Sequence, residues 1–324
     1  MVLLRGRVWL AMPDSMIQGE PLTLNHQGEI EALLAPLRTG LSEYSFPNLY
    51  LFRHIHNYRY QPTKLPCIAG ATYNGCRHLL PLFDLASAPG DQLLERLAGY
   101  DCYFPLSQQV IGRLDTTALT VGAERADADY LYPIENFLHY RGERLSKKRN
   151  QMRQFLREGR HREVCFGAAA ADDALSVLRA WQTEKGKTNE ETDWHACLEA
   201  VSLSSVLGLY GFIYYLDDRP VGFLLGEEAA DNVFVIHFAK GLVEAPGIYP
   251  YMFHHLSGQI ADRFRWINFE QDLGLPNFRR NKMSYAPHSL LPKYRLFRAE
   301  SSGRLYQFSN QRCSQGDEGI QPVC

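Results

Sequence analysis

The second half of the chain alternates between apolar runs and segments with helical spacing. Short apolar runs predict strands at 163–167, 209–216, 220–227, 232–238 and 266–270. Apolar positions three and four residues apart predict helices at 172–185, 193–204 and 249–263. Polar turns at 217–218 and 231–232 are short enough to join the middle three strands into an antiparallel meander. The predicted order is strand, two helices, meander, helix and strand.

The first half follows a similar order less regularly. Helices are predicted at 29–37, 46–52 and 91–97, and strands at 65–71, 78–82, 101–105 and 118–121. Asn74-Gly75 indicates a hairpin between the first two of these strands. A basic helix at 146–158 has an apolar face and is followed by Gly159, a residue typical of helix ends.

These elements predict an α/β fold with mixed sheets, and the length predicts two domains of ordinary size. We expect an N-terminal arm at 1–20, a first domain at 21–158 that ends in the basic connecting helix, a second domain at 159–298, and a polar tail at 299–324.

Composition is that of a soluble globular protein and excludes a disordered chain, because 45% of the residues are hydrophobic and 22% are charged. The net charge of −2 implies that any phosphate-bearing partner is bound by local basic patches. Residues 141–162 contain nine Lys or Arg and two acids, and residues 279–298 contain six Lys or Arg and no acid. These two segments are therefore the candidate patches.

Cysteine usage and the N-terminus indicate a cytoplasmic protein. The seven cysteines show no CxxC pair and no metal-ligand spacing, so we expect reduced thiols and no metal site. Arg5 and Arg7 interrupt the N-terminal apolar residues, which is unlike a secretory signal. No apolar run is long enough for a transmembrane segment.

The segment 266–282 combines a predicted strand with charges that a core does not need. Glu270 and Asp272 lie two positions apart and would share one face if the strand continued through them. A Gly-Leu-Pro turn follows, and then Arg279, Arg280 and Lys282. The acids are candidates for orienting or deprotonating an acceptor amine, and the cations for holding a phosphate-bearing donor. The alternative is a structural ion cluster in which the cations pair with the acids.

Several motifs together resemble one family. They are Asp129-Tyr130-Leu131-Tyr132, Gly142, Lys147-Lys148-Arg149-Asn150, Phe155, the aromatic segment 46–52, His237-Phe238-Ala239-Lys240, Gly247-Ile248-Tyr249 and the segment 268–282. Their order over residues 20–296 is similar to that of the C-terminal domains of phosphatidylglycerol lysyltransferases. The resemblance implies two tandem acyl-CoA N-acyltransferase (GNAT)-like domains, related to Fem-type aminoacyl transferases. It also implies transfer of an aminoacyl group from a charged tRNA to an acceptor, which is a lipid in the named enzymes.

Candidate site residues follow from the motifs and from general acyl-transfer chemistry. Asp272, Glu270 and His237 are the catalytic candidates, with His237 as a base, although a histidine in an apolar strand also suits a core position. Lys240 is placed to meet a phosphate or carboxylate, or to lie at a solvated strand end. The remaining candidates for donor or substrate binding are Gly247, Tyr249, Asn268, Arg279, Arg280, Lys282, Tyr285, Lys147, Lys148, Arg149 and Asn150.

The donor is expected to be aminoacyl-tRNA, with acyl-CoA as the alternative and no tightly bound cofactor. An acyl-CoA loop presents free backbone N–H groups and glycines to the pyrophosphate. Residues 244–249 begin with an acid, include Pro246, and place Tyr249 where a second small residue is usual. tRNA is thus a possible partner, and the acceptor would be a small molecule, a peptide or a lipid. A different class of function, non-catalytic binding of a small charged metabolite or peptide, stays open.

Overall fold

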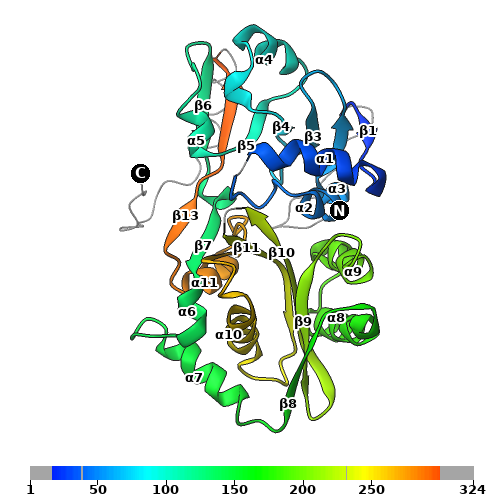
Figure 1. Cartoon of the computed structure of the whole chain (residues 1–324), viewed down its shortest axis with the longest axis vertical. Helices are drawn as coiled ribbons and strands as arrows, with labels where there is room; N and C mark the ends of the chain where they lie inside the picture. The colour runs from blue at the N-terminus through cyan, green and yellow to red at the C-terminus, as the bar shows by residue number, and fades with distance from the viewer. Residues whose placement is uncertain (1–16, 38, 231, 300–324) are drawn as a thin grey trace. The chain divides into compact units, whose positions relative to one another are not determined.

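The computed structural model describes residues 17–37, 39–230 and 232–299, and Figure 1 shows its helices and strands. The expected arm and tail lie outside the described residues, except for 17–20 and 299. The chain divides into two compact units, which we describe separately. Residues 17–129, 271–275 and 289–299 form the N-unit, and residues 130–270 and 276–288 form the C-unit.

The N-unit is built on a mixed sheet with the strand order β1-β2-β3-β4-β5-β14-β6. Its strands are β1 (Glu20–Pro21), β2 (Arg59–Gln61), β3 (Cys67–Ala71), β4 (Arg77–Pro81), β5 (Cys102–Leu106), β6 (Leu119–Ala123) and β14 (Tyr294–Arg298), and β13 (Ser289–Leu291) precedes β14 in the chain. β3 and β4 form the antiparallel hairpin predicted from Asn74-Gly75, and Gly75 has the positive φ (81°) that such a turn needs. β4 and β5 are parallel, and β14 lies antiparallel between β5 and β6.

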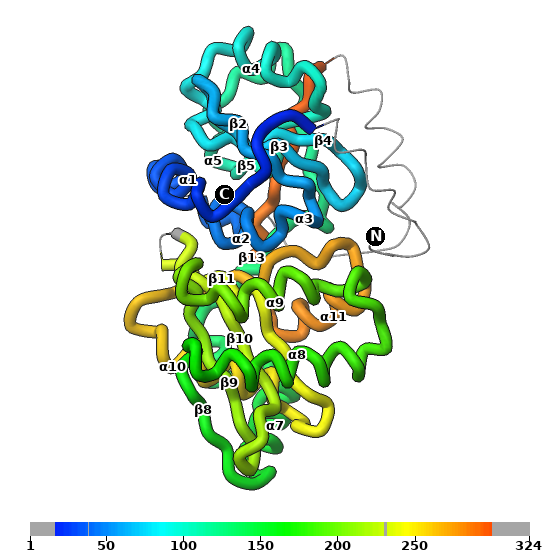
Figure 2. Tube along the Cα trace, turned by 90° about the vertical axis from the view of Figure 1, so that its right-hand side faces the viewer, coloured from blue at the N-terminus to red at the C-terminus, as the bar shows by residue number. Residues whose placement is uncertain are grey.

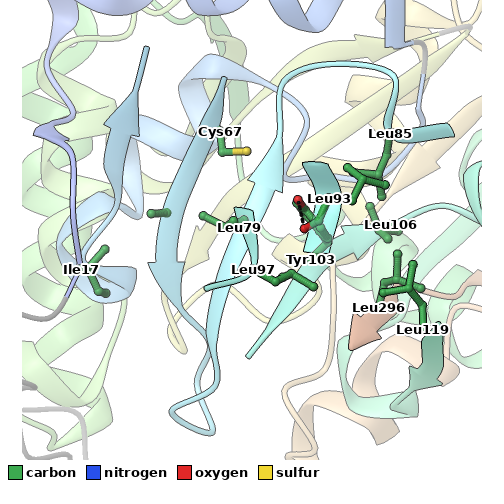
Figure 3. Close-up of a cluster of buried hydrophobic side chains, with 11 residues drawn as sticks. Ile17, Cys67, Leu79, Leu85, Leu93, Leu97, Tyr103, Leu106, Leu119 and Leu296 are labelled. Carbon is green, nitrogen blue, oxygen red and sulfur yellow. Dashed lines mark hydrogen bonds between the residues drawn. The ribbon is translucent and has the colours of Figure 1, made fainter. Parts of the chain in front are cut away.

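Helices and a cluster of buried side chains complete the N-unit. The helices are α1 (Gln27–Leu34), α2 (Phe46–Leu51), α3 (Arg53–His56), α4 (Gly90–Arg96) and α5 (Gln108–Ile111). Leu79 of β4, Tyr103 of β5 and Leu296 of β14 are fully buried and belong to one hydrophobic cluster (Figure 3). β14 therefore brings residues from the end of the described chain into the core of this unit.

The C-unit contains the predicted meander within a second mixed sheet, and the strands that this unit contributes to it follow the order β7-β12-β11-β10-β9-β8. These strands are β7 (Asp129–Pro133), β8 (His161–Cys165), β9 (Tyr210–Leu216), β10 (Arg219–Ala230), β11 (Val233–Gly241) and β12 (Trp266–Asn268). β9, β10 and β11 are antiparallel neighbours, whereas β11 and β12 are parallel. The predicted α/β class with mixed sheets is thus confirmed.

Helices cover both faces of this second sheet. They are α6 (Ile134–His139), α7 (Ser146–Phe155), α8 (Ala171–Lys185), α9 (Trp194–Ser202), α10 (Ile248–Ile260) and α11 (Pro276–Met283). α8 and α9 pack together on one face, and α10 packs with α6 and α7 on the other (Figures 1 and 2). Among the described residues, no helix has the length and apolar character that a membrane span requires.

The compact units do not coincide with the domains expected from the sequence. The expected boundary follows the basic helix, whereas β7, α6 and α7 all lie in the C-unit. β7 is there because it pairs antiparallel with β12, with Trp266 opposite Pro133. α7 is there because its fully buried Phe155 packs against Tyr251 of α10, with 4.8 Å between the ring centroids.

Candidate functional site

β11 and β12 pair over the three residues of β12. Val233–Val235 are opposite Trp266–Asn268, and β11 then continues beyond the end of β12, past His237 and Lys240 to Gly241, where it is still paired with β10. The prediction that the last strand extends to Glu270 is wrong, because β12 ends at Asn268 and Glu270 has a φ of 56°. The side chain of Asn268 is fully buried and accepts a hydrogen bond from the Glu270 N–H at 2.7 Å. Asn268 therefore shapes the turn by which the chain leaves the sheet.

His237 of β11 lies between two carboxylates of the C-unit. Its Nδ1 is 2.8 Å from Glu270 Oε1, and its Nε2 is 2.8 Å from Glu227 Oε1 of β10. The His237 side chain is fully buried, whereas the Glu227 and Glu270 side chains are 9% and 17% exposed. Burial opposes a charge on the ring, but the hydrogen bonds and charges of the two glutamates outweigh it and raise the pKa of His237 to about 10. We therefore interpret His237 as an imidazolium that holds Glu270 in place, and not as the base expected from the sequence.

Lys240 is also satisfied within the C-unit. Its Nζ is 2.7 Å from each carboxylate oxygen of Asp193 and 4.0 Å from the ring centroid of Trp181 on α8. The residue is 4% exposed, and the charge of Asp193 overcomes the effect of burial and raises the pKa of the Lys240 ammonium. These contacts indicate a structural ion pair. They do not support the hypotheses that Lys240 binds a phosphate or lies at a solvated strand end.

The start of α10 packs closely against α7 and the end of β11. Gly247 has a φ of 87°, and a methyl group on it would lie 1.9 Å from the backbone oxygen of Gln151 in α7. The Tyr249 hydroxyl accepts a hydrogen bond from the Gly241 N–H at 3.1 Å, at the end of β11. The glycine thus serves the close packing of α7 against α10, and the tyrosine is bound to the backbone that borders this loop.

The two acids of the segment 266–282, Glu270 and Asp272, have separate surroundings. Asp272 belongs to the N-unit and is fully buried, with its Oδ2 3.0 Å from Arg125 Nη1 and its Oδ1 accepting from the Gly274 N–H at 2.8 Å. The shared strand face predicted for Glu270 and Asp272 is wrong, because neither residue lies in a strand. A buried carboxylate that pairs with a half-buried arginine and also closes a tight turn is typical of a structural role.

The basic part of the motif forms a helix and not a loop. Arg279, Arg280 and Lys282 lie on α11, where Arg280 is exposed and Arg279 is partly exposed. Lys282 Nζ donates to the backbone oxygens of Phe269 at 2.5 Å and Glu270 at 3.0 Å. Lys282 therefore fixes the turn that carries Glu270.

The basic helix α7 has both structural and exposed cations. Arg149 Nη1 donates to the backbone oxygens of Tyr140 and Gly142, just after α6, which gives it a capping role. Lys148 Nζ is 3.8 Å from the ring centroid of Tyr285, and burial together with the charge of Lys147 lowers the pKa of Lys148 to about 8. The exposed polar residues of this helix include Lys147, Asn150 and Arg153.

A pocket of about 470 Å³ opens near the start of α7. Its lining includes Arg141, Arg144 and His288, all exposed, together with the partly buried Asn136. Glu143 is the acid in this lining. The pocket therefore extends the basic surface of α7 into a concave site of the size that small molecules occupy.

A buried charge cluster in the N-unit was missed by sequence reasoning. Lys293 Nζ lies 2.6 Å from Glu43 Oε1, 2.6 Å from Asp129 Oδ1, 2.7 Å from Gln271 Oε1 and 3.1 Å from Ser42 Oγ. The Lys293 and Asp129 side chains are fully buried, and Glu43 is 10% exposed. Asp129 belongs to a recognised motif, but Lys293 is 250 positions from Glu43, so no local pattern could have paired them.

Glu43 should make stability depend on pH. Burial and the charge of Asp129 raise the pKa of Glu43 from 4.5 to about 7, despite the opposing charge of Lys293. The folded state then binds a proton that the unfolded state releases, so this stabilisation is present below pH 4.5 and is lost as pH rises through about 7. We expect Glu43→Gln to gain stability relative to the unmodified protein across this window, measured by urea unfolding. If the unfolding free energies of the two proteins changed with pH in the same way, a raised pKa of Glu43 would be contradicted.

Comparisons with known proteins agree with this architecture. Residues 34–297 match the model of the family described as phosphatidylglycerol lysyltransferase, C-terminal. A conserved protein of unknown function from Bacteroides thetaiotaomicron has a similar fold, with 19% identity, a TM-score of 0.74, and coverage of 87% of this chain and 99% of that chain. A comparison with curated proteins gives no match.

Two further solved structures have similar folds. L-PGS from Bacillus licheniformis is 13% identical, with a TM-score of 0.60 and coverage of 90% of this chain and 96% of that chain. FemX is 8% identical, with a TM-score of 0.59 and coverage of 90% and 99%. These identities are low, so the likeness is one of fold.

Proposed function

The chain belongs to the phosphatidylglycerol lysyltransferase C-terminal-domain family, and from this premise we propose that it transfers an aminoacyl group from aminoacyl-tRNA to an amine or hydroxyl acceptor. The family and the fold support a transferase of the aminoacyl class. The donor, the acceptor and the residues that act on them belong to the proposal, as does a cytoplasmic location in which charged tRNA is available.

The close packing at the start of α10 is the observation that carries the choice of donor. An acyl-CoA pyrophosphate needs accessible backbone N–H groups at a helix N-terminus. Here the Gln151 backbone oxygen packs against Gly247, and Pro246 has no N–H to offer. An aminoacyl ester brings no pyrophosphate to this loop, so the packed loop is compatible with aminoacyl-tRNA and unfavourable for acyl-CoA.

The exposed edge of the Glu227–His237–Glu270 cluster is the proposed reaction site. Glu270 has the most exposed side chain of the three, and its Oε1 lies 2.8 Å from the His237 ring. We propose that the Glu270 carboxylate binds and orients a cationic amine, either on the acceptor or on the aminoacyl group. The acceptor nitrogen or oxygen then bonds to the ester carbonyl carbon, the bond to the tRNA ribose oxygen breaks, and the acceptor proton passes through solvent to that oxygen.

The exposed cations of α7 are the proposed contact for the tRNA backbone. Lys147, Arg153 and Arg157 are exposed on or just after this helix, and the nearby pocket adds Arg141 and Arg144. Contacts between Lys or Arg and phosphates need no fixed spacing and give binding that weakens with salt. Arg149 is held by the backbone oxygens of Tyr140 and Gly142, so we assign the phosphate contacts to the exposed cations around it.

A transfer assay with two donors tests the proposal. Purified protein is mixed with a pool of tRNAs charged with labelled amino acids, or with labelled acetyl-CoA, and with phosphatidylglycerol vesicles, peptides or small amines. We expect a labelled acceptor from charged tRNA, identified by mass spectrometry. Transfer from acetyl-CoA alone would support the acyl-CoA alternative. Binding of an acceptor without turnover from either donor would support the non-catalytic reading.

Substitution of Glu270 tests the proposed site. Glu270→Gln keeps the size of the side chain and removes its charge, so we expect kcat/KM for aminoacyl transfer to fall by about 100-fold. Glu228→Gln is the matched control, because Glu228 lies on β10 of the same unit and is exposed, with its carboxylate 2.8 Å from Arg263. Equal activity of the two variants, at unchanged urea midpoints, would remove Glu270 from the mechanism.

A further inference from the structure

Two thiols of the N-unit lie in contact at the edge of its core. Cys76 follows the Asn74-Gly75 turn of the β3–β4 hairpin, and Cys102 is the first residue of β5. Parallel pairing of β4 with β5 places His78 opposite Cys102 and so brings Cys76 close. The two sulfur atoms are 3.5 Å apart. Of the five cysteines in the described residues, only these two have their sulfur atoms in contact.

The two thiols differ in access and in acidity. Cys76 is partly exposed, whereas Cys102 is fully buried beside Phe104 and Phe297. The hydrogen bond between Cys76 and Cys102 and the charge of Arg295 lower the pKa of Cys76, although burial opposes this. Burial, and then the bond to Cys76, raise the pKa of Cys102. Cys76 is thus the less buried thiol and the one with the lowered pKa, and Cys102 is the buried thiol in contact with it.

We propose that Cys76 and Cys102 are a modification site, a dithiol that hydroperoxides oxidise to a disulfide. The Cys76 thiolate attacks the terminal peroxide oxygen, the O–O bond breaks, and Cys76 becomes a sulfenic acid while hydrogen peroxide yields one water. The Cys102 thiol then attacks the Cys76 sulfur, the S–S bond forms, and the sulfenic oxygen leaves as a second water. Two thiols are oxidised and one peroxide is reduced, so the atoms and electrons balance.

Forming the disulfide requires a small movement of the hairpin turn. A disulfide has an S–S distance of about 2.05 Å, so the sulfur atoms must move together by about 1.5 Å. Cys102 is fixed within the sheet, but Cys76 lies outside β4 at the end of a tight turn. Its backbone is held to Thr72 by hydrogen bonds at both the N–H and the carbonyl, so movement of the turn carries Cys76 with it. The disulfide would tie the hairpin turn to β5.

Peptide mapping of the full-length reduced protein tests the proposal. The protein is treated with hydrogen peroxide, remaining thiols are alkylated, and proteolytic peptides are identified by mass spectrometry. We expect a linked pair of peptides containing Cys76 and Cys102, which dithiothreitol separates. Cys102→Ser should retain a sulfenic acid on Cys76 that dimedone labels. Cys165→Ser should still form the link, because Cys165 is an exposed thiol of the C-unit and is the matched control.

Two results would overturn the proposal. One is oxidation of Cys165 by peroxide while Cys76 and Cys102 remain free thiols, as shown by their complete alkylation afterwards. The other is conversion of Cys76 to a sulfinic acid while Cys102 remains a thiol. Both results can be measured on the protein without any substitution. The test therefore does not depend on whether a serine variant folds. The outcome is independent of the aminoacyl donor, because the readout is the state of the thiols.

Discussion

Lys293→Ala is expected to lower the unfolding free energy of the N-unit by about 3–5 kcal/mol. The lysine ammonium is buried against two carboxylates, and its removal leaves Glu43 and Asp129 beside each other without a cation. Gln271 and Ser42 also lose a hydrogen-bond donor. A buried carboxylate that cannot be hydrated or paired is among the most costly defects in a folded protein.

Urea unfolding followed by circular dichroism measures this loss. Lys64→Ala is the matched control, because Lys64 is exposed in the same unit, and we expect a change within about 0.5 kcal/mol. Adding Glu43→Gln to Lys293→Ala should recover part of the stability, since Gln is neutral in the buried site whereas Glu43 must bind a proton on folding. A loss below about 1 kcal/mol for Lys293→Ala would mean that water or other groups replace the ammonium, contrary to the buried cluster described above.

Gly247→Ala is expected to destabilise the C-unit by about 2–5 kcal/mol, the sum of a left-handed backbone cost and an overpacking cost. Gly247 has a φ of 87°, and its new methyl group would lie 1.9 Å from the Gln151 oxygen. Because that oxygen belongs to the backbone of α7, relief requires movement of the whole helix. The defect would therefore spread to the packing of Phe155 against Tyr251.

The same helix provides the control for this substitution. Gly258 also lies in α10, and a methyl group there would meet no atom within 4 Å. Gly258→Ala is expected to stabilise the protein by about 0.5–1 kcal/mol through helix propensity. The comparison also tests the function of the loop. If Gly247→Ala abolished transferase activity at unchanged urea midpoints, the glycine would serve the donor and not the helix packing.

The candidate site was predicted only in part. His237, Glu270 and Asn268 were identified from the sequence and do lie together, through contacts of 2.7–2.8 Å. Their neighbour Glu227 was not identified, because a glutamate in an apolar strand gives no signal of what it faces across the sheet. Asp272 was expected beside Glu270, but a chain reversal at Glu270 and Leu273, both with positive φ, sends it to Arg125. Positive φ at non-glycine residues is rarely visible in a sequence.

Local patterns determined the element order from 161 to 268, the meander, the hairpin at Asn74-Gly75 and the family, because periodicity, turn residues and motifs act over a few neighbouring positions. They did not indicate β7, α6, α11, β13 or β14. Tertiary structure alone decided which charges meet. Lys293 and Glu43 are 250 positions apart, and Lys240 and Asp193 are 47 apart, so only the folded sheets bring them together. It also decided the charge of His237, since a pKa depends on burial and on nearby carboxylates. The motif residues were visible in the sequence, but their chemistry was set by their surroundings in the fold.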